Sequence, residues 1–351
     1  MLMKKKKIKN DLSLLKLLAE DQSNQNYLYK PTNYWKSNSF RTENNIKRLG
    51  IEEFRSVPAI SKGFSDVITY DPLEIFSGSH IKEKFILKLN KTSFIRKYCT
   101  QYYLKKINNL INENLKLKSE LFEKNYGNWL KEFLFKKKKI EMNYGKPSDK
   151  LMVNGKYYPK TYLTAFKRID LMSKLIDLKK IKCIFEIGGG FGSFAHSILS
   201  FYNNICKLYY LDIVPNIYLG TQYLDLLFPR IVKNYKFTKN QNLLLSKEKK
   251  VIFAIPPWEL KKIQNDFDLF VNFASFQEID KKVLINYLEL IKKRSKNKTL
   301  FCFGFYKTDK NNRLNSDEVL RLVRSFFGNE INAVGNNFLD LEEEIYLFKN
   351  K

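Results

Sequence analysis

A carboxylate and a cluster of glycines occur together in the segment CIFEIGGGFGSFAHSILSFY (183–202). Four glycines follow Glu186 closely: Gly188, Gly189, Gly190 and Gly192. The apolar run at 183–187 predicts a buried strand, and residues 193–201 predict a helix. Glycine allows a sharp turn and lets a ligand lie against the backbone, and the unpaired N–H groups of a helix end favour an anionic group. The segment therefore predicts a loop that cradles a nucleotide cofactor, rather than a simple tight turn.

The spacing of the glycines and the nearby carboxylate distinguish between two classes of cofactor. A dinucleotide-binding loop has the pattern G-x-G-x-x-G, and here Ser193 stands at the position of its third glycine. An acidic residue followed by G-x-G-x-G resembles motif I of the class I S-adenosylmethionine-dependent methyltransferases. The resemblance implies that Glu186 helps to hold the methionyl amino group while the loop backbone lies along the cofactor. A carboxylate suits this cationic ligand and would repel a pyrophosphate. The alternative for Glu186 is a strand-end carboxylate whose partners are backbone donors.

A second carboxylate, Asp212, ends the next predicted strand at 207–214, and Ile213 follows it. At this position an acidic side chain accepts hydrogen bonds from the two ribose hydroxyls of the cofactor. Both classes of cofactor need this contact, so Asp212 indicates a nucleoside ligand without choosing between them. The alternative is an N-cap for the helix at 216–227, a role that Asn216 is equally able to fill.

The third strand, at 251–255, continues into the turn IPPWEL. A turn at this position lies near the adenine, so we expect Ile255 and Trp258 to flank the base. The alternative is a proline-rich turn with a packed tryptophan. The turn also resembles the D/N-P-P-Y/F/W motif of amino-group methyltransferases that act on adenine or cytosine. Ile255, however, stands where that motif requires a polar side chain to hold the target amine.

Four segments in this order resemble the bacterial sugar O-methyltransferase family: FEIGGGFGSFA, YYLDIVP, IPPWEL and LFVNFASFQEID. In that family an E-I-G-G-G-[YF]-G loop precedes a strand ending in aspartate, a proline-rich turn and an S-F-x-E-M loop. The upstream segment NYWKSNSFRTENNIKRLGIEEFRS (33–56) is similar to its amino-terminal region, and Ile279 replaces the methionine. The resemblance covers most of residues 30–310. It implies methyl transfer to a sugar hydroxyl of a cell-surface polysaccharide or glycan precursor, with a sugar, nucleotide-sugar or glycan intermediate as acceptor.

The catalytic candidates lie in DLFVNFASFQEIDKK (268–282), where polar side chains follow the fourth predicted strand. A hydroxyl is a poor nucleophile until its proton is removed, so the reaction needs a base. We expect Glu278 to be that base. Asn272 and Ser275 are expected to orient the acceptor, and Asn272 also to contact the cofactor. The alternative is that Asn272, Gln277 and Glu278 cap and brace the helix that begins at 280.

Other groups that could act as a base or bind a metal are few. The chain has two histidines: His196, in the helix after the glycine loop, is expected to pack or face solvent, and His80 lies in a segment that could cap the site. Asp266 and Asp268 are the closest approach to a carboxylate cluster. They lie at the start of a strand, which is the wrong end for the site, so we predict that no metal takes part.

The elements that must position these residues change character near residue 150. Residues 1–150 predict a mainly helical region, which we expect to form an acceptor-side cap with aromatic residues at Tyr102, Tyr103, Tyr126 and Trp129. Residues 151–351 predict the S-adenosylmethionine-binding methyltransferase domain. There, strands alternate with helices, as in a parallel sheet covered on both faces, and the tail predicts a two-stranded hairpin. The fold class is therefore α/β: a Rossmann-like class I methyltransferase sheet, mostly parallel with an antiparallel last strand.

Charge and cysteine content constrain the partners and the compartment. The net charge is +27, but only 10 of the 63 basic residues are arginine and the excess is spread over both halves. Nucleic-acid recognition relies on arginine and on a concentrated basic face, so the composition argues against a nucleic-acid partner. Compositional drift in an AT-rich genome explains the excess of lysine better. Four widely separated cysteines argue against disulfides and for a reducing, cytoplasmic location.

The first twenty residues, MLMKKKKIKNDLSLLKLLAE, are a poor signal peptide and too short to cross a membrane. They predict an amphipathic helix with Leu12, Leu15 and Leu18 on one face. That face either packs against the rest of the protein or attaches loosely to the anionic inner face of a membrane. The sequence leaves the oligomeric state open.

Two other functions remain as alternatives to sugar O-methylation. A methyltransferase that acts on RNA or protein would share the cofactor site, and RNA binding would weaken steeply with salt. A nicotinamide-dependent dehydrogenase or epimerase, or a nucleotide-binding protein without catalysis, would instead bind NAD or another nucleotide at the glycine loop.

Overall fold

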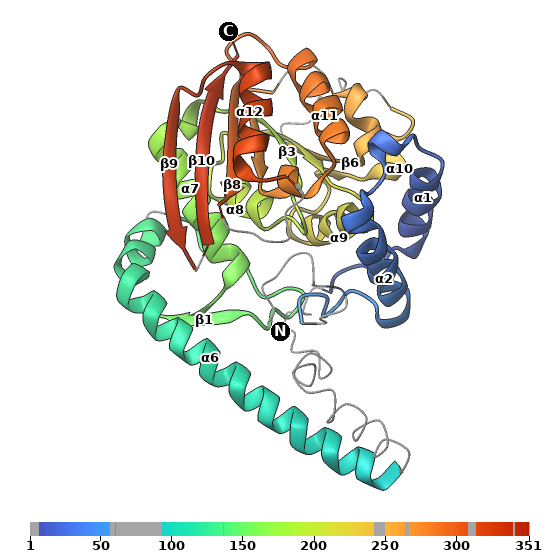
Figure 1. Cartoon of the computed structure of the whole chain (residues 1–351), viewed down its shortest axis with the longest axis vertical. Coiled ribbons are helices and arrows are strands. Elements are labelled where there is room, and N and C mark those ends of the chain that lie inside the picture. Colours follow the sequence, from blue (N-terminus) through green and yellow to red (C-terminus); the bar gives the residue numbers. More distant parts are fainter. Residues whose placement is uncertain are drawn as a thin grey trace.

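A single eight-stranded sheet forms the centre of the computed structural model (Figure 1). The structure describes residues 7–56, 60, 93–135, 137–241, 250–263, 267–307, 314–339 and 341–350. The strand order is β5-β6-β4-β3-β7-β8-β10-β9. The strands are β3 (Cys183–Ile187), β4 (Lys207–Leu211), β5 (Val232–Lys233), β6 (Val251–Ile255), β7 (Leu269–Phe273), β8 (Leu300–Tyr306), β9 (Asn332–Phe338) and β10 (Leu341–Lys349).

The strands from β5 to β8 are parallel, and β10 is antiparallel to both β8 and β9. The predicted Rossmann-like sheet, mostly parallel with an antiparallel last strand, is therefore confirmed, as is the hairpin at the tail. Along the chain, β4 and β5 lead outward from β3, β6 then fits between them, and the chain returns to β7 on the other side of β3. The strand order therefore reverses at β3, and sheets of this kind have their ligand-binding crevice at the carboxyl ends of the strands there.

Helices cover both faces of the sheet, because each inner strand is apolar on both sides. One apolar core joins the sheet to α7 (Lys160–Leu175), α8 (Ser193–Phe201) and α9 (Asn216–Leu227). A second core, on the opposite face, joins it to α11 (Lys281–Lys293) and α12 (Ser316–Phe327). Residues at successive positions of β3 alternate between the two cores, as Ile184 and Phe185 do.

Helix α7 and the predicted strand at 207–214 both end earlier than the apolar pattern of the sequence alone suggests. Helix α7 ends at Leu175, and strand β4 ends at Leu211. The carbonyl of Leu211 makes the last rung by accepting from the Gly188 N–H, after which Asp212 leaves the ladder. Apolar patterning extends these elements in sequence, whereas the hydrogen-bonded ladder decides where they stop.

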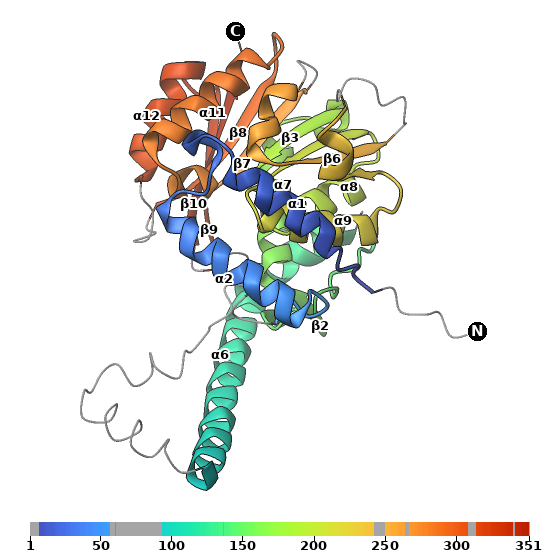
Figure 2. The same cartoon turned by 90° about the vertical axis from the view of Figure 1, so that its right-hand side faces the viewer.

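The described part of the amino-terminal region contains helices and is followed by a small hairpin. The helices are α1 (Leu12–Ser23), the short 3₁₀ helix η1 (Tyr27–Tyr29), α2 (Asn33–Leu49) and α6 (Ser93–Phe135), and the hairpin consists of β1 (Lys150–Val153) and β2 (Lys156–Pro159). Helix α10 (Tyr235–Thr238), which follows β5 in the chain, contacts α1. The 43-residue helix α6 projects from the body of the molecule, and its carboxyl-terminal half lies beside β1 and the sheet (Figures 1 and 2).

Helix α1 packs against α9 and α10, so its apolar face is buried inside the protein. The buried residues are Leu14, Leu15 and Leu18, whereas Leu12 is 42% exposed. The prediction that Leu12 belongs to this face is wrong: Leu14 and Leu18 are one helical turn apart and flank Leu15, whereas Leu12 is the first residue of the helix. The face serves packing, which is the first of the two predicted roles. Among the described residues, no helix has the length and apolar content needed to cross a membrane.

Candidate functional site

The glycine loop leaves the carboxyl end of β3 and enters α8 at Ser193, as the sequence predicts. Gly192, with φ of +94°, immediately precedes the helix. The carboxyl ends of β4 and β7 lie on either side, because Ile187 pairs with Leu211 and with Asn272. The loop therefore lies at the crevice where the strand order reverses, which is the expected ligand site of such a sheet.

Two of the glycines are required by the protein's own packing as well as by access for a ligand. Gly188 has φ of +79°, and a Cβ there would overlap the Ser275 side chain. A Cβ at Gly189 would overlap the ring of Tyr210. The Tyr210 hydroxyl donates to the Gly190 carbonyl, so this ring supports the loop from β4. Sequence reasoning missed Tyr210, whose only signal was its place two residues before Asp212.

Glu186 is the most unusual polar group of the site. Its side chain lies under the loop and is 3% exposed. Within the described part of the chain, its Oε2 atom is buried without a hydrogen-bond partner. Burial, followed by the nearby charge of Asp212, raises the pKa of Glu186 to about 8, and Arg168 opposes the shift. The alternative of a carboxylate satisfied by backbone donors does not describe this oxygen, since such an atom costs free energy unless a ligand supplies a donor.

Asp212 holds the loop from the neighbouring strand. Its Oδ2 atom accepts from the Gly190 N–H at 2.7 Å and its Oδ1 atom from the Ile213 N–H at 2.7 Å. Burial raises the pKa of Asp212 to about 7, although these hydrogen bonds and one from Asn216 favour the ionised form. Helix α9 has Pro215 at its N-cap position and no side-chain cap. Asp212 therefore serves the glycine loop and not the end of the helix.

The two buried carboxylates are chemically suited to a positively charged, hydroxyl-bearing ligand. Each ionised group raises the cost of ionising the other, and a cation between them removes that cost. An ammonium group would supply the donor that Glu186 Oε2 lacks. A pyrophosphate would meet two buried carboxylates, so their charge disfavours a dinucleotide.

The expected adenine contacts lie in well-packed positions. Ile255 is fully buried, and Ile213 is half-buried beside Asp212. Trp258 is 5% exposed and donates from its indole nitrogen to the Tyr235 hydroxyl at 2.8 Å. Tyr235 in turn donates to Asp21 of α1 at 2.7 Å. The tryptophan thus ties the turn after β6 to the amino-terminal helix, which matches the packed-turn alternative.

Asn272 and Ser275 connect the ends of β7 and β3. The Asn272 amide donates to the Ile187 carbonyl at 2.9 Å and to the Ser275 hydroxyl at 2.6 Å, and its oxygen accepts from the Phe276 N–H. Asn272 is fully buried, and Ala274 between them has φ of +67°. The structure places both side chains against the glycine loop. The contacts of Asn272 therefore join the loop after β7 to the end of β3, and they do not reach the helix that it was expected to brace in the alternative.

Gln277 joins the loop after β7 to the end of β8, whereas Glu278 does not. The Gln277 amide exchanges two hydrogen bonds with the backbone of Tyr306 at 2.8 Å each. Glu278 is half-buried, and its Oε2 atom accepts from the indole nitrogen of Trp35 at 3.0 Å. Helix α11 has Asp280 at its N-cap position. The carboxylate of Glu278 therefore points toward the amino-terminal region instead of capping the helix.

The amino-terminal segment from Gln22 to Trp35 passes over this edge of the sheet (Figure 2). Gln22 accepts from the Val214 N–H at 3.2 Å, just beyond Asp212. At the other end, Thr32 donates to the Glu278 carbonyl at 3.3 Å. The segment thus joins the loops after β4 and β7, on either side of the glycine loop. The sequence signal for Trp35 was its place in the 33–56 resemblance, which gave it no role.

Replacing Trp35 by phenylalanine tests this connection. We expect Trp35→Phe to lower the free energy of unfolding by about 1–2 kcal/mol, because a hydrogen bond to a charged, half-buried group is lost. Urea denaturation measures the change, and Trp129→Phe is a matched control that loses an indole donor to Asp170 on α7 instead. In a double-mutant cycle, Trp35→Phe should couple to Glu278→Ala and not to changes at Asp170. Additive effects at Trp35 and Glu278 would contradict the connection.

The histidines and the aspartates of the metal hypothesis lie away from this site or outside the described residues. His196 is buried and lies 2.5 Å from the Tyr162 hydroxyl, and burial lowers its pKa to about 3. It is packed, as one of the two expectations had it. Asp268 accepts from the Lys182 and Cys183 N–H groups at the start of β3. His80 and Asp266 lie outside the described residues, among which no cluster of three metal-ligating side chains occurs.

Of the aromatic residues expected on the acceptor side, two can be placed. Tyr126 packs against Phe122 and Phe338, and Trp129 donates to Asp170 of α7 at 3.0 Å. Both therefore join α6 to the body of the protein. The side chains of Tyr102 and Tyr103 lie outside the described part of the chain.

Comparisons with known proteins give weak likenesses only. No family model matches the sequence, and no curated protein does. Among solved structures, N-methyltransferase NodS from Bradyrhizobium japonicum WM9, in complex with S-adenosyl-L-homocysteine, is similar at 14% identity and a TM-score of 0.35, over 52% of this chain and 86% of that one. Mitomycin 7-O-methyltransferase MmcR is similar at 12% identity and a TM-score of 0.37, over 53% of this chain and 54% of that one. Magnesium protoporphyrin IX methyltransferase ChlM from Synechocystis PCC 6803, with bound S-adenosylmethionine, is similar at 8% identity and a TM-score of 0.38, over 67% of this chain and 97% of that one. Likenesses of this strength say nothing about the substrate of this chain.

Proposed function

We propose that this chain is an S-adenosylmethionine-dependent O-methyltransferase that acts on a sugar hydroxyl of a polysaccharide or glycan precursor. The observation that carries the proposal is the buried, unpartnered Oε2 atom of Glu186 beside the glycine loop. In this role Glu186 pairs with the methionyl ammonium group, and Asp212 accepts from the ribose hydroxyls. The backbone from Gly188 to Gly192 lies along the cofactor, and the turn that carries Ile255 and Trp258 closes the adenine side through packing.

Catalysis in this proposal needs one base and a well-held site. Bound S-adenosylmethionine supplies a methyl group that its sulfonium already activates. Glu278 takes the proton of the acceptor hydroxyl, and the Trp35 indole holds its carboxylate in place. Asn272 and Ser275 fix the distance between the β7 loop and the glycine loop. The segment from Gln22 to Trp35 covers the same edge and shields it from water.

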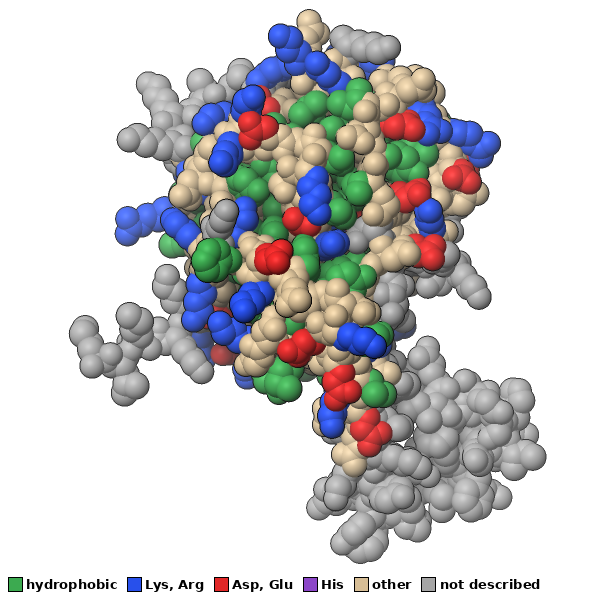
Figure 3. All heavy atoms as spheres, turned by 90° about the vertical axis from the view of Figure 1, so that its left-hand side faces the viewer, with side chains coloured by type: hydrophobic (Ala, Val, Ile, Leu, Met, Phe, Trp, Pro, Cys, Tyr) green, Lys and Arg blue, Asp and Glu red, His purple; other side chains and the backbone are tan. Residues whose placement is uncertain are grey.

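The sugar acceptor rests on the order of the four sequence motifs and on the region before residue 150, which we propose as the acceptor-side cap. The RNA alternative would be favoured by a continuous basic surface. On the face drawn in Figure 3, lysine and arginine side chains alternate with acidic and apolar ones. The described residues of that face form no concentrated phosphate-binding stripe, which supports a smaller acceptor.

A thermal-shift comparison of four ligands tests the proposed cofactor. We expect S-adenosylmethionine and S-adenosylhomocysteine to raise the melting temperature, and NAD and NADP to leave it unchanged, because only the first two carry an ammonium group for Glu186. At 100 times the dissociation constant, binding contributes about 2.7 kcal/mol. Adenosine is the matched control, since it has the ribose but not the ammonium, and should stabilise less. Stabilisation by NAD alone would contradict the proposal.

A further inference from the structure

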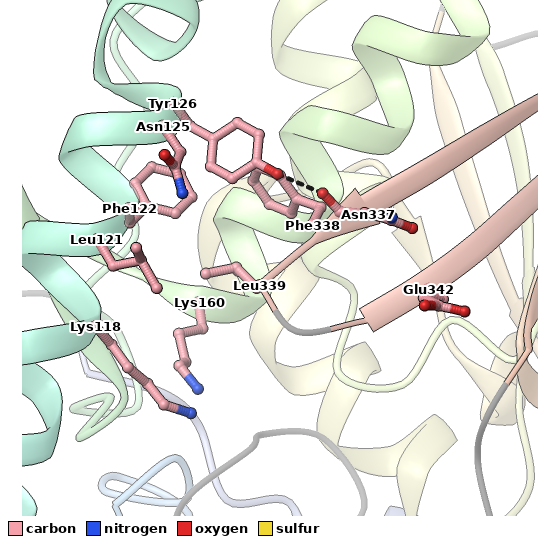
Figure 4. A pocket seen from close by; sticks show the side chains of 10 residues that line it. All are labelled: Lys118, Leu121, Phe122, Asn125, Tyr126, Lys160, Asn337, Phe338, Leu339 and Glu342. Atoms are coloured by element: carbon pink, nitrogen blue, oxygen red, sulfur yellow. Dashed lines mark hydrogen bonds between the residues drawn. The ribbon is translucent and has the colours of Figure 1, made fainter.

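A pocket of about 300 Å³ lies between α6 and the turn that joins β9 to β10 (Figure 4). Helix α6 contributes Lys118, Phe122 and Tyr126, the start of α7 contributes Lys160, and the end of β9 contributes Phe338. None of these residues belongs to the glycine loop or to the loop that follows β7. Pockets that bind small organic ligands begin at about this volume, so the space admits one sugar ring with a substituent.

One end of the pocket is basic. Lys118 and Lys160 extend from two different helices and bring their ammonium groups toward each other (Figure 4). Lys160 is only 4% exposed, although lysine is rarely buried. Of the described residues that line the pocket, Glu342 is the acidic one, and it lies at the opposite end. A phosphate or carboxylate between the two lysines would accept hydrogen bonds from both ammonium groups.

The wall beside the lysines is aromatic. Phe122, Tyr126 and Phe338 form one cluster, with ring centroids 5.0–5.3 Å apart. The Tyr126 hydroxyl donates to the Asn337 carbonyl, which ties α6 to β9 across the cluster. Asn125 adds an amide to the rim. Aromatic side chains beside a few polar groups suit the apolar face and the hydroxyls of a sugar ring.

The pocket lies at the same edge of the sheet as the glycine loop. In the register of the sheet, Glu343 near the start of β10 pairs with Tyr306 at the carboxyl end of β8. Gly304 of β8 pairs with Phe273 at the end of β7, and Asn272 beside it pairs with Ile187 of β3. Three strand spacings of about 4.8 Å therefore separate β3 from β10, or roughly 14 Å. The pocket, which is lined by Phe338 of β9, lies one strand further along the same edge.

We infer that this pocket binds the charged part of the acceptor: the phosphate or carboxylate of an anionic sugar, together with its adjoining ring. Lys118 and Lys160 hold the anion, and the aromatic cluster contacts the ring. The remaining part of the acceptor then extends along the sheet edge toward Glu278. The link to methyl transfer rests on the proposed function, whereas binding of the anionic sugar does not.

Isothermal calorimetry without any methyl donor tests the inference, using glucose 1-phosphate, glucuronate, glucose and inorganic phosphate as probes. We expect one of the two anionic sugars to bind at least about tenfold more tightly than glucose and than inorganic phosphate, since it alone engages both halves of the pocket. The tighter of the two identifies the anion as phosphate or carboxylate. Equal binding of glucose and both anionic sugars would overturn the inference, as would phosphate binding as tightly as the sugars.

Matched lysine variants locate the binding. Lys118→Met should weaken the anionic sugar by about tenfold, whereas Lys116→Met, exposed on the same helix, should leave it unchanged. Because Lys160 is buried and its replacement risks the fold, Asn125→Trp at the pocket rim serves as the second variant and should block all the sugars. Unchanged binding by Lys118→Met and Asn125→Trp would overturn the inference. S-adenosylmethionine affinity is measured on the same samples. If wild-type protein binds the anionic sugar but not this donor, the proposed function fails and the pocket stands.

Discussion

Glu278→Gln is expected to reduce the rate of methyl transfer by about 10²–10⁴-fold, because glutamine cannot accept the proton of the acceptor hydroxyl. The glutamine oxygen still accepts a hydrogen bond from Trp35, so the loop after β7 should keep its position. The affinity for S-adenosylmethionine should therefore change by no more than about twofold. Single-turnover transfer of a radiolabelled methyl group to a panel of nucleotide sugars and sugar phosphates measures the rate.

The control for this experiment is Glu289→Gln, which removes an exposed carboxylate on α11 a few residues further along the chain. It should transfer methyl groups at the wild-type rate. The pH profile gives a second measure: wild-type turnover should fall in acid as the base is protonated, and the residual turnover of Glu278→Gln should not follow that limb. If Glu278→Gln keeps the wild-type rate, the base lies elsewhere, whether or not the cofactor site is correct.

Affinity for S-adenosylmethionine should rise with pH, and Glu186 should be responsible. The pKa of Glu186 is raised from 4.5 to about 8 and that of Asp212 from 3.8 to about 7, so both carboxyls hold protons in the ligand-free protein near pH 6. A cationic ligand requires the ionised form and must displace a proton. The association constant should therefore increase by up to about tenfold per pH unit between pH 5.5 and pH 7.

The folding stability of the ligand-free protein should change with pH in the opposite direction: it should fall as the pH rises. Both carboxyls keep in the folded state protons that the unfolded chain has already released. Their contribution to stability is therefore complete below about pH 4, and it is lost as the pH rises through the folded-state values of about 7 and 8. Glu186→Gln removes one ionisable group, so it should flatten both pH dependences and leave the protein folded at pH 8.

At pH 7.5, Glu186→Gln should weaken S-adenosylmethionine by about 100-fold, since it removes one partner of a buried charge pair. Asp268→Asn is the matched control, because Asp268 accepts from the backbone at the opposite end of the same strand. It should leave the affinity unchanged. Calorimetry in two buffers of different ionisation enthalpy measures the affinity and the protons released. Binding that neither depends on pH nor releases protons would contradict the role assigned to Glu186.

The apolar pattern along the chain is enough to locate most strands of the sheet. Strands β3, β6 and β7 occupy the residues expected, because a strand buried on both faces must be a short, continuous apolar run. The glycine loop was equally clear, since the turn from a strand into a helix needs positive φ angles that few other residues adopt. Both the buried strands and the glycine loop depend on residues that are neighbours in the sequence, so a short segment is enough to predict them.

The tertiary structure alone decided what each polar side chain of the site contacts. Asn272 and Ser275 looked like groups aimed at an acceptor, but the close approach of β7 to β3 directs them to the glycine loop. Trp35 contacts Glu278 although the two residues are 243 positions apart. The pocket beside Lys118 forms where α6 packs against the end of β9. Such contacts depend on how distant elements pack, and no periodicity or spacing within one segment records that packing.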